Sequence, residues 1–282
     1  MSRFTFLILC PDQVGIIAKT TAFLHQRKGN IVYLDQYVDP EAQMFFMRLE
    51  CDGIGLSSDQ LRSEFNEALA IPFQMQWRMD SDENLPKMAL FVSKYDHCLY
   101  DILGRHAAGE LQVEIPFIIS NHPDLAPVAE QFGIPYHHIP VTKDTKPEAE
   151  AAQLALLEAH KIDLIVLARY MQIVSPKLID RYPNRIINIH HSFLPAFPGA
   201  KPYHSAYARG VKIIGATSHY VTEDLDAGPI IEQDTTQVSH IHSVTDFIRK
   251  GRDLEKIVLS RAIRQHLEGK TMVYDNKTVI FH

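Results

Sequence analysis

Residues 185–199 read RIINIHHSFLPAFPG, an apolar run that ends in polar side chains. The run Arg185 to His190 predicts a buried strand. Alternate residues of a strand point the same way, so Asn188 and His190 should share one face while Ile189 turns into the core. An amide donor beside an imidazole can stabilise a developing oxyanion. The pattern therefore predicts a candidate catalytic centre at the end of this strand.

Strand and helix patterns alternate around this run. Before it, strands are expected at 87–93, 113–120, 136–139 and 164–167, with helices at 97–107, 124–132 and 146–160. After it, we expect strands at 213–221 and 230–235, a long helix at 244–266, and a closing hairpin from 272–274 and 278–281. Such alternation predicts an α/β domain with a doubly wound, mostly parallel sheet, whose ligands bind at the carboxyl ends of the strands.

The first eighty residues carry a different pattern. Strands are expected at 4–10, 31–38, 44–51 and 73–80, and helices at 16–24 and 61–69. This order is the ferredoxin-like βαββαβ arrangement. Residues 81–86 are polar, acidic and end in proline, which is typical of a linker. We therefore expect one domain at 1–80 and a second at 87–282.

Composition narrows the class of partner. The chain has 282 residues, of which 46% are hydrophobic and 22% charged, and its net charge is −6. An acidic balance argues against a nucleic-acid or anionic-membrane partner, so small molecules are favoured. Three scattered cysteines are too few for a disulfide framework, and no apolar stretch approaches the roughly 20 residues that span a bilayer. These features indicate a cytoplasmic protein.

The segment after Asn188 resembles the signature of the folate-dependent formyltransferase family, which joins Asn-x-His to Ser-Leu-Leu-Pro. In that family a catalytic Asp follows the Asn by the same interval that separates Asp226 from Asn188. The resemblance covers most of residues 87–282 and implies that Asn188, His190 and Asp226 are the catalytic residues. More narrowly, the whole chain resembles the members that pass the formyl group to water. It implies hydrolysis of 10-formyltetrahydrofolate to tetrahydrofolate and formate, with no cofactor, and a role in supplying formate for purine synthesis and balancing one-carbon pools.

The same resemblance implies a folate pocket. Residues 167–175 are similar to the family segment that wraps the pteridine, and residues 222–226 match the loop that hydrogen-bonds the edge of the ring. The implied folate-binding residues are Leu167, Met171, Gln172, Ile173, Val174, Ile186, Val221, Thr222, Glu223 and Leu225.

The first domain, with CPDQVGI at residues 10–16, resembles an ACT domain, a regulatory module that commonly binds amino acids at paired interfaces. Gly15 would let a ligand approach the backbone, and the following helix N-terminus could receive a carboxylate. Asp12 and Gly15 are therefore the possible effector site. The resemblance implies a homo-oligomer, either a dimer or a tetramer. The other interpretation is an oligomerisation domain with an empty pocket.

Residues 92–99, VSKYDHCL, indicate which molecule accepts the formyl group. Relatives that formylate a phosphorylated amine carry a glycine-rich loop here, whose backbone N–H groups cradle phosphate. This chain has no glycine in the loop, which favours water as the acceptor over a phosphorylated amine. His191 stands where many amine-formylating relatives carry proline, and on a strand it would face away from His190. The alternative is formyl transfer to an amine such as glycinamide ribonucleotide.

Two other classes of protein fit the sequence less well. A metal-dependent deformylase would need converging ligands, but there is no His-Glu-x-x-His motif, and the adjacent histidines of a strand should diverge. His240 and His242 could share a face, although they are expected in a loop. A non-catalytic amino-acid sensor is the second class, against which the intact Asn188, His190 and Asp226 argue. We expect no metal site.

Overall fold

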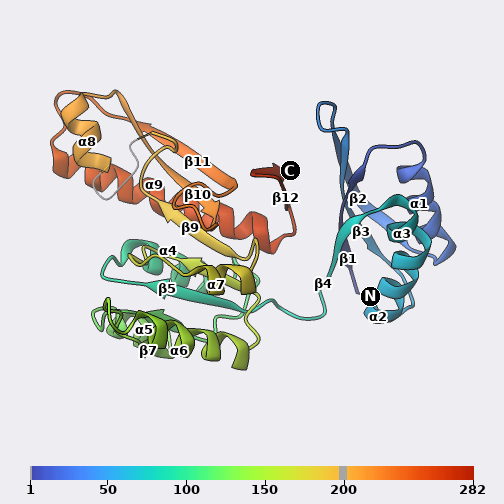
Figure 1. Ribbon diagram of the computed structural model, residues 1–282, viewed down its shortest axis with the longest axis horizontal. Helices are drawn as coiled ribbons and strands as arrows, with labels where there is room; N and C mark the ends of the chain where they lie inside the picture. Colours follow the sequence, from blue (N-terminus) through green and yellow to red (C-terminus); the bar gives the residue numbers. More distant parts are fainter. Residues whose placement is uncertain (1, 197–201) are drawn as a thin grey trace. The chain divides into compact units, whose positions relative to one another are not determined.

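The computed structural model describes residues 2–196 and 202–282, and the chain divides into two compact units (Figure 1). One unit runs to Leu85 and includes Phe281–His282, and the other is Pro86–Ile280. Each unit has its own buried apolar cluster. Among the described residues, no helix combines the length and apolar character needed to cross a bilayer.

The first unit contains four strands and helices on one face of their sheet. The strands are β1 (Phe4–Pro11), β2 (Asn30–Asp39), β3 (Met44–Asp52) and β4 (Gln76–Ser81), and the helices are α1 (Ile16–Gln26) and α2 (Ser58–Phe65), the latter continued by the π-helical turn η1 (Asn66–Ala70) and α3 (Ile71–Phe73). The strand order is β2-β3-β1-β4, with antiparallel neighbours. The expected ferredoxin-like arrangement is confirmed.

One boundary in this unit differs from the prediction. Residues 73–75 were expected to begin the last strand, but Phe73 ends α3 and Gln74 reverses the chain with φ 54°. Strand β4 begins only at Gln76. Phe73 and Met75 are both buried in the same core as Met79. The alternating pattern therefore continued through the turn because both segments bury apolar side chains.

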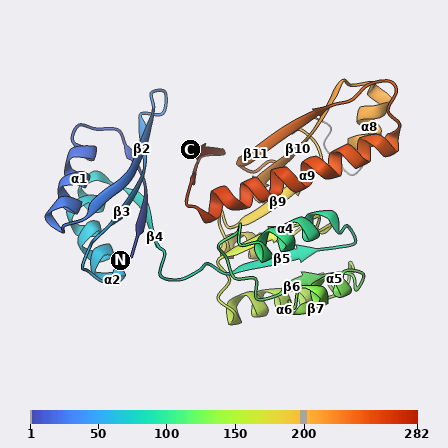
Figure 2. The same cartoon turned by 180° about the vertical axis from the view of Figure 1, so that it is seen from behind.

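The second unit is a seven-stranded sheet of order β11-β10-β9-β8-β5-β6-β7 (Figures 1 and 2). Its strands are β5 (Met88–Val92), β6 (Ile118–Ser120), β7 (Tyr136–His138), β8 (Leu164–Leu167), β9 (Ile186–His190), β10 (Ile213–Tyr220) and β11 (Ile230–Gln237). Neighbours from β5 to β9 are parallel, while β10 and β11 are antiparallel. The doubly wound, mostly parallel sheet is confirmed.

Helices cover both faces of this sheet. They are α4 (His97–Ala107), α5 (Ala126–Gln131), α6 (Lys146–Ala159), α7 (Pro176–Arg181), α8 (Pro202–Arg209) and α9 (Val244–Leu267), and β12 (Thr271–Tyr274) with β13 (Lys277–Ile280) forms the expected hairpin. In β5, Leu90 packs with α4, α5 and α9, whereas Phe91 packs with α6 and α7. Alternate side chains thus enter two separate cores, which explains the continuous apolar strands.

The expected strand at 113–120 is shorter in the structure. Only Ile118–Ser120 forms β6, and Glu114 makes an isolated bridge with Lys87. Pro116 stands between them and cannot donate a hydrogen bond to a neighbouring strand. The proline therefore limits the ladder to its last three residues.

Candidate active site

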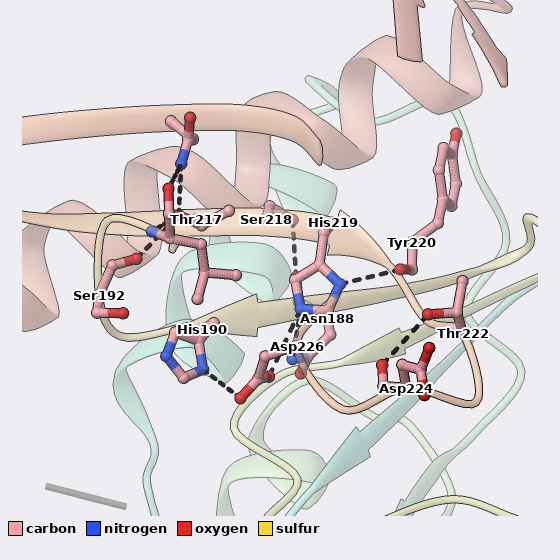
Figure 3. Close-up of polar contacts among 12 residues, drawn as sticks. Asn188, His190, Ser192, Thr217, Ser218, His219, Tyr220, Thr222, Asp224 and Asp226 are labelled. Atoms are coloured by element: carbon pink, nitrogen blue, oxygen red, sulfur yellow. Dashed lines mark hydrogen bonds and ion pairs between the residues drawn. The ribbon is translucent and has the colours of Figure 1, made fainter. Parts of the chain in front are cut away.

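Asn188 and His190 lie at the carboxyl end of β9 and face the same side (Figure 3). Ile189 enters the core on the opposite side, as the alternation predicts. Strand β10 runs antiparallel to β9 and pairs His219 directly with Asn188. Directly opposed residues share a face, so the Asn188 Nδ2 atom lies 3.2 Å from His219 Nε2.

Asp226 reaches this group from the loop between β10 and β11. The loop is folded tightly back: Tyr220 donates its N–H to the Pro229 carbonyl at 2.9 Å, and a Cβ at Gly228 would collide with the Tyr220 carbonyl. Asp226 itself adopts φ 55°, a left-handed conformation that costs about 1–3 kcal/mol in a non-glycine residue. Its Oδ2 lies 3.1 Å from His190 Nδ1, and its Oδ1 lies 3.7 Å from His219 Nε2 (Figure 3).

The charges of this group are set by hydrogen bonding. Burial alone would raise the pKa of Asp226, but the hydrogen bond from His190 outweighs this effect and holds the pKa well below its ordinary value. The carboxylate is therefore ionised near neutral pH and orients His190 through Nδ1. The His190 Nε2 atom is buried and has no hydrogen-bond partner in the part of the chain that the structure describes. That nitrogen is left free for a substrate.

His219 is oriented by its own backbone. Its Nδ1 lies 2.9 Å from the Tyr220 carbonyl oxygen, which can only accept, so Nδ1 carries a hydrogen. In the neutral ring, Nε2 then accepts from the Asn188 amide. This bond directs the Asn188 NH₂ group and leaves its second hydrogen for a ligand. His219 was not predicted from the sequence, because its place opposite Asn188 depends on the antiparallel register of β10 against β9.

These side chains line a cavity of about 320 Å³. Nine of the ten implied folate-binding residues line it as well: Leu167, Met171, Gln172, Ile173, Val174, Val221, Thr222, Glu223 and Leu225. Ile186 is the exception, since it is buried in the core at the start of β9 and does not border the cavity. The Ile186 side chain packs beneath the cavity, two residues before Asn188, and its contact with folate stays a prediction.

His191 and Arg169 also line the cavity and were not among the predicted site residues. His191 lies beyond the last residue of β9, so strand alternation does not extend to it. It borders the cavity, and its ring centroid lies 5.2 Å from that of His190, which corrects the expectation that it faces away. Arg169 follows β8 and also borders the cavity. Nothing in the sequence distinguished Arg169 from an ordinary surface cation.

The remaining candidate sites lie elsewhere. In the first unit, Gly15 precedes α1 with φ 97°, and a Cβ there would meet nothing within 4 Å, so the position expected for an effector is open. His242 receives a hydrogen bond from the Ser239 backbone at 2.9 Å. One group of potential metal ligands occurs among the described residues, namely His97, Cys98 and Glu255. Its carboxylate is already paired with protein groups.

Comparison with known proteins agrees with this geometry. Residues 86–263 match the formyl transferase family and residues 4–59 match the ACT domain. A formyltetrahydrofolate deformylase from Synechocystis is 54% identical over 279 residues, covering 98% of both chains, and one from Bacillus subtilis is 47% identical over 98% of this chain and 93% of the other. The crystal structure of a deformylase from Pseudomonas syringae superimposes with a TM-score of 0.97 at 48% identity, covering 100% of this chain and 95% of the other.

A more distant structure is also informative. Glycinamide ribonucleotide transformylase 1 from Symbiobacterium toebii is 29% identical with a TM-score of 0.67, and the match covers 72% of this chain and 97% of the other. The match to this transformylase therefore leaves part of the chain uncovered, whereas the match to the Pseudomonas syringae deformylase covers the whole chain. The chain therefore belongs to the formyl transferase family and, within it, to the formyltetrahydrofolate deformylases.

Proposed function

We propose that this chain hydrolyses 10-formyltetrahydrofolate to tetrahydrofolate and formate, with Asn188, His190 and Asp226 as its catalytic residues. The observation that carries the assignment is the convergence of these three side chains, from two separate segments, on one cavity. The named activity of the full-length relatives supports the same reaction.

The chemistry follows from the geometry. Water attacks the formyl carbon, negative charge develops on the formyl oxygen, and the bond to N10 of the folate breaks. The free hydrogen of the Asn188 amide donates to the oxyanion, an interaction whose loss typically costs about 10²–10³ in rate. Asp226 already accepts from His190 Nδ1, so His190 Nε2 is the atom that exchanges protons with water and the leaving nitrogen. Positioned proton transfer contributes about 10²–10⁴.

The cavity accommodates the folate ring between two segments. Apolar side chains of residues 167–174 form one wall, and the loop 222–226 supplies polar backbone on the other. A flat heterocycle with a hydrogen-bonding edge fits such a lining. No step of this mechanism uses a metal or cofactor, and we propose that the reaction needs neither.

The physiological setting is part of the proposal. The enzyme acts in the cytoplasm as a homo-oligomer, supplies formate for purine synthesis and balances one-carbon pools. Its ACT domain binds an amino-acid effector at the open turn around Asp12 and Gly15, which the match to that domain supports. Nucleic acids and membranes are not partners, consistent with the net charge of −6.

A direct assay separates the candidate functions. Purified protein with 10-formyltetrahydrofolate should release formate and tetrahydrofolate in equal amounts, and an excess of metal chelator should leave the rate unchanged. The alternative, transfer to glycinamide ribonucleotide, predicts turnover only when that amine is added. A non-catalytic sensor predicts no turnover in either mixture.

A further inference from the structure

A second buried group of polar side chains lies beside the active site, and we call Arg169, His97, Tyr203 and Glu255 the Glu255 network. The Glu255 side chain is 1% exposed. Its Oε2 lies 2.8 Å from His97 Nε2 and 3.4 Å from Arg169 Nε, and the Tyr203 hydroxyl donates to Oε1 at 2.7 Å. Burial alone would raise the pKa of Glu255, but the His97 hydrogen bond and the Arg169 charge outweigh it and lower the pKa. The carboxylate is thus a fixed negative centre.

The Glu255 network joins the catalytic cavity at two points. Arg169 stands two residues beyond β8 and borders the cavity itself. Tyr203 packs edge-on against His191 with ring centroids 5.7 Å apart, and His191 borders the cavity next to His190. His97 and Glu255 do not border it. His97, Tyr203 and Glu255 therefore form a layer directly behind Arg169 and His191, two side chains of the cavity wall.

This arrangement includes a strained backbone conformation at Arg169, which adopts φ 63°. That conformation suits glycine, and in other residues it costs about 1–3 kcal/mol. The arginine side chain is held there by Glu255 and also lies over the Tyr95 ring at 4.9 Å. A strained position filled by a long side chain indicates that the side chain itself is needed.

A glycine on α9 shapes the other end of the network. Gly251 lies one turn before Glu255, and a Cβ at Gly251 would collide with Cζ and Oη of Tyr203. Glycine inside a helix costs about 0.5–1 kcal/mol relative to alanine. The bare backbone lets the Tyr203 ring lie against the helix and reach the carboxylate.

The Glu255 network is poorly suited to bind a metal ion. Cys98 completes a possible ligand set with His97 and Glu255, but burial raises the pKa of its thiol well above the ordinary value, and the negative charge of Glu255 raises it further. The guanidinium of Arg169 already neutralises the carboxylate.

We propose that the Glu255 network closes the acceptor side of the active site, so that water and not an amine receives the formyl group. This proposal rests on the proposed function and deepens it by naming the residues that set the acceptor. In hydrolysis, water oxygen bonds to the formyl carbon, the carbon–N10 bond breaks, and N10 gains the proton that water loses. If an amine attacked instead, its nitrogen would bond to the formyl carbon and N10 would gain the proton that the amine loses. Side chains that fill the acceptor side would exclude the amine by steric repulsion and so set the specificity for water.

The first test opens the wall from the cavity side. Arg169→Gly removes the side chain at a φ that glycine adopts freely, and glycinamide serves as the probe amine. We expect the ratio of N-formylglycinamide to formate to rise at least about tenfold over wild type, within the range of about 10–200 that pocket shape commonly gives. Lys161→Gly is the matched control, since Lys161 is exposed, has φ 54° and does not border the cavity. Its ratio should equal that of wild type.

The second test displaces Tyr203 from the far side. Gly251→Ala should also raise the ratio, whereas Gly104→Ala, a helical glycine whose Cβ would meet nothing within 4 Å, should not. Two products compete for one bound substrate, so their ratio is insensitive to general loss of stability. Folded Arg169→Gly and Gly251→Ala proteins that release only formate would overturn the proposal. Wild type that releases no formate would instead overturn the proposed function.

Discussion

Two histidine–carboxylate pairs in the described part of the catalytic domain have similar geometry and different surroundings. His190 Nδ1 lies 3.1 Å from Asp226, and His97 Nε2 lies 2.8 Å from Glu255. In both pairs hydrogen bonds lower the pKa of the carboxyl group against the effect of burial. Only the first pair borders the cavity. A buried ion pair alone therefore does not indicate catalysis.

The partners of each carboxylate explain the difference. Glu255 is surrounded by Tyr203, Arg169 and His97, which occupy both of its oxygens. Asp226 orients a ring whose other nitrogen has no partner among the residues that the structure describes. The first arrangement stabilises a wall, and the second keeps a proton-transfer atom available. The same change of carboxylate to amide in the two pairs should separate these roles.

The largest expected effect is on turnover. Asp226→Asn should lower kcat by about 10²–10⁴, because His190 loses the carboxylate that orients it and balances its charge. Folate binding should persist, since most of the cavity lining is unchanged. Formate release and folate titration measure the two quantities. Glu255→Gln is the matched comparison and should lower kcat far less; equal losses in both variants would remove the distinction between the pairs.

The next effect concerns the oxyanion. Asn188→Ala removes the amide that His219 orients, and kcat should fall by about 10²–10³ with little change in KM. Steady-state kinetics checks this split. A loss confined to KM would show that Asn188 binds the ground state only.

A smaller effect is expected on thermal stability. Here Glu255→Gln should have the larger effect of the two substitutions, the reverse of their order for kcat. Glu255→Gln leaves the buried Arg169 charge without its partner, and breaking such a pair typically costs about 3–5 kcal/mol. Asp226→Asn leaves no buried arginine unpaired, so its thermal midpoint should fall less. Calorimetry of both variants tests the order, and a more stable Glu255→Gln protein would contradict it.

The smallest effect is a dependence on pH. The pKa of Asp226 is lower in the folded protein than its unfolded value of about 3.9, so its contribution to stability is present above that value and is lost as the pH falls through the folded pKa. Between about pH 5 and pH 3, the thermal midpoint of wild type should fall more than that of Asp226→Asn. Parallel curves for the two proteins would show that the pKa is not lowered.

Much of the fold was predictable because its patterns are local. Alternation in β3 and the apolar runs of β1 and of the parallel sheet gave the correct architecture in both units. Errors arose where one residue interrupts a pattern, as Pro116 shortens β6 and Gln74 turns the chain before β4. Such interruptions depend on backbone conformation more than on hydrophobicity.

The site was predictable where a motif carries the chemistry and not where the fold assembles it. The resemblance to the family motif implied Asn188, His190 and Asp226, and these side chains do converge. His219 requires the register of β10 against β9. The role proposed for Arg169 requires its contact with Glu255, which lies on α9 far along the chain. Contacts between distant segments leave no mark on sequence periodicity.

Isotope transfer from solvent tests the central claim, that water is the acceptor at the His190–Asp226 pair. The protein is incubated with 10-formyltetrahydrofolate and glycinamide ribonucleotide in H₂¹⁸O, and the products are examined by mass spectrometry. The account predicts formate that carries one ¹⁸O atom for each tetrahydrofolate formed, and no formylated amine. Recovery of the formyl group on the amine, with no labelled formate, would contradict it.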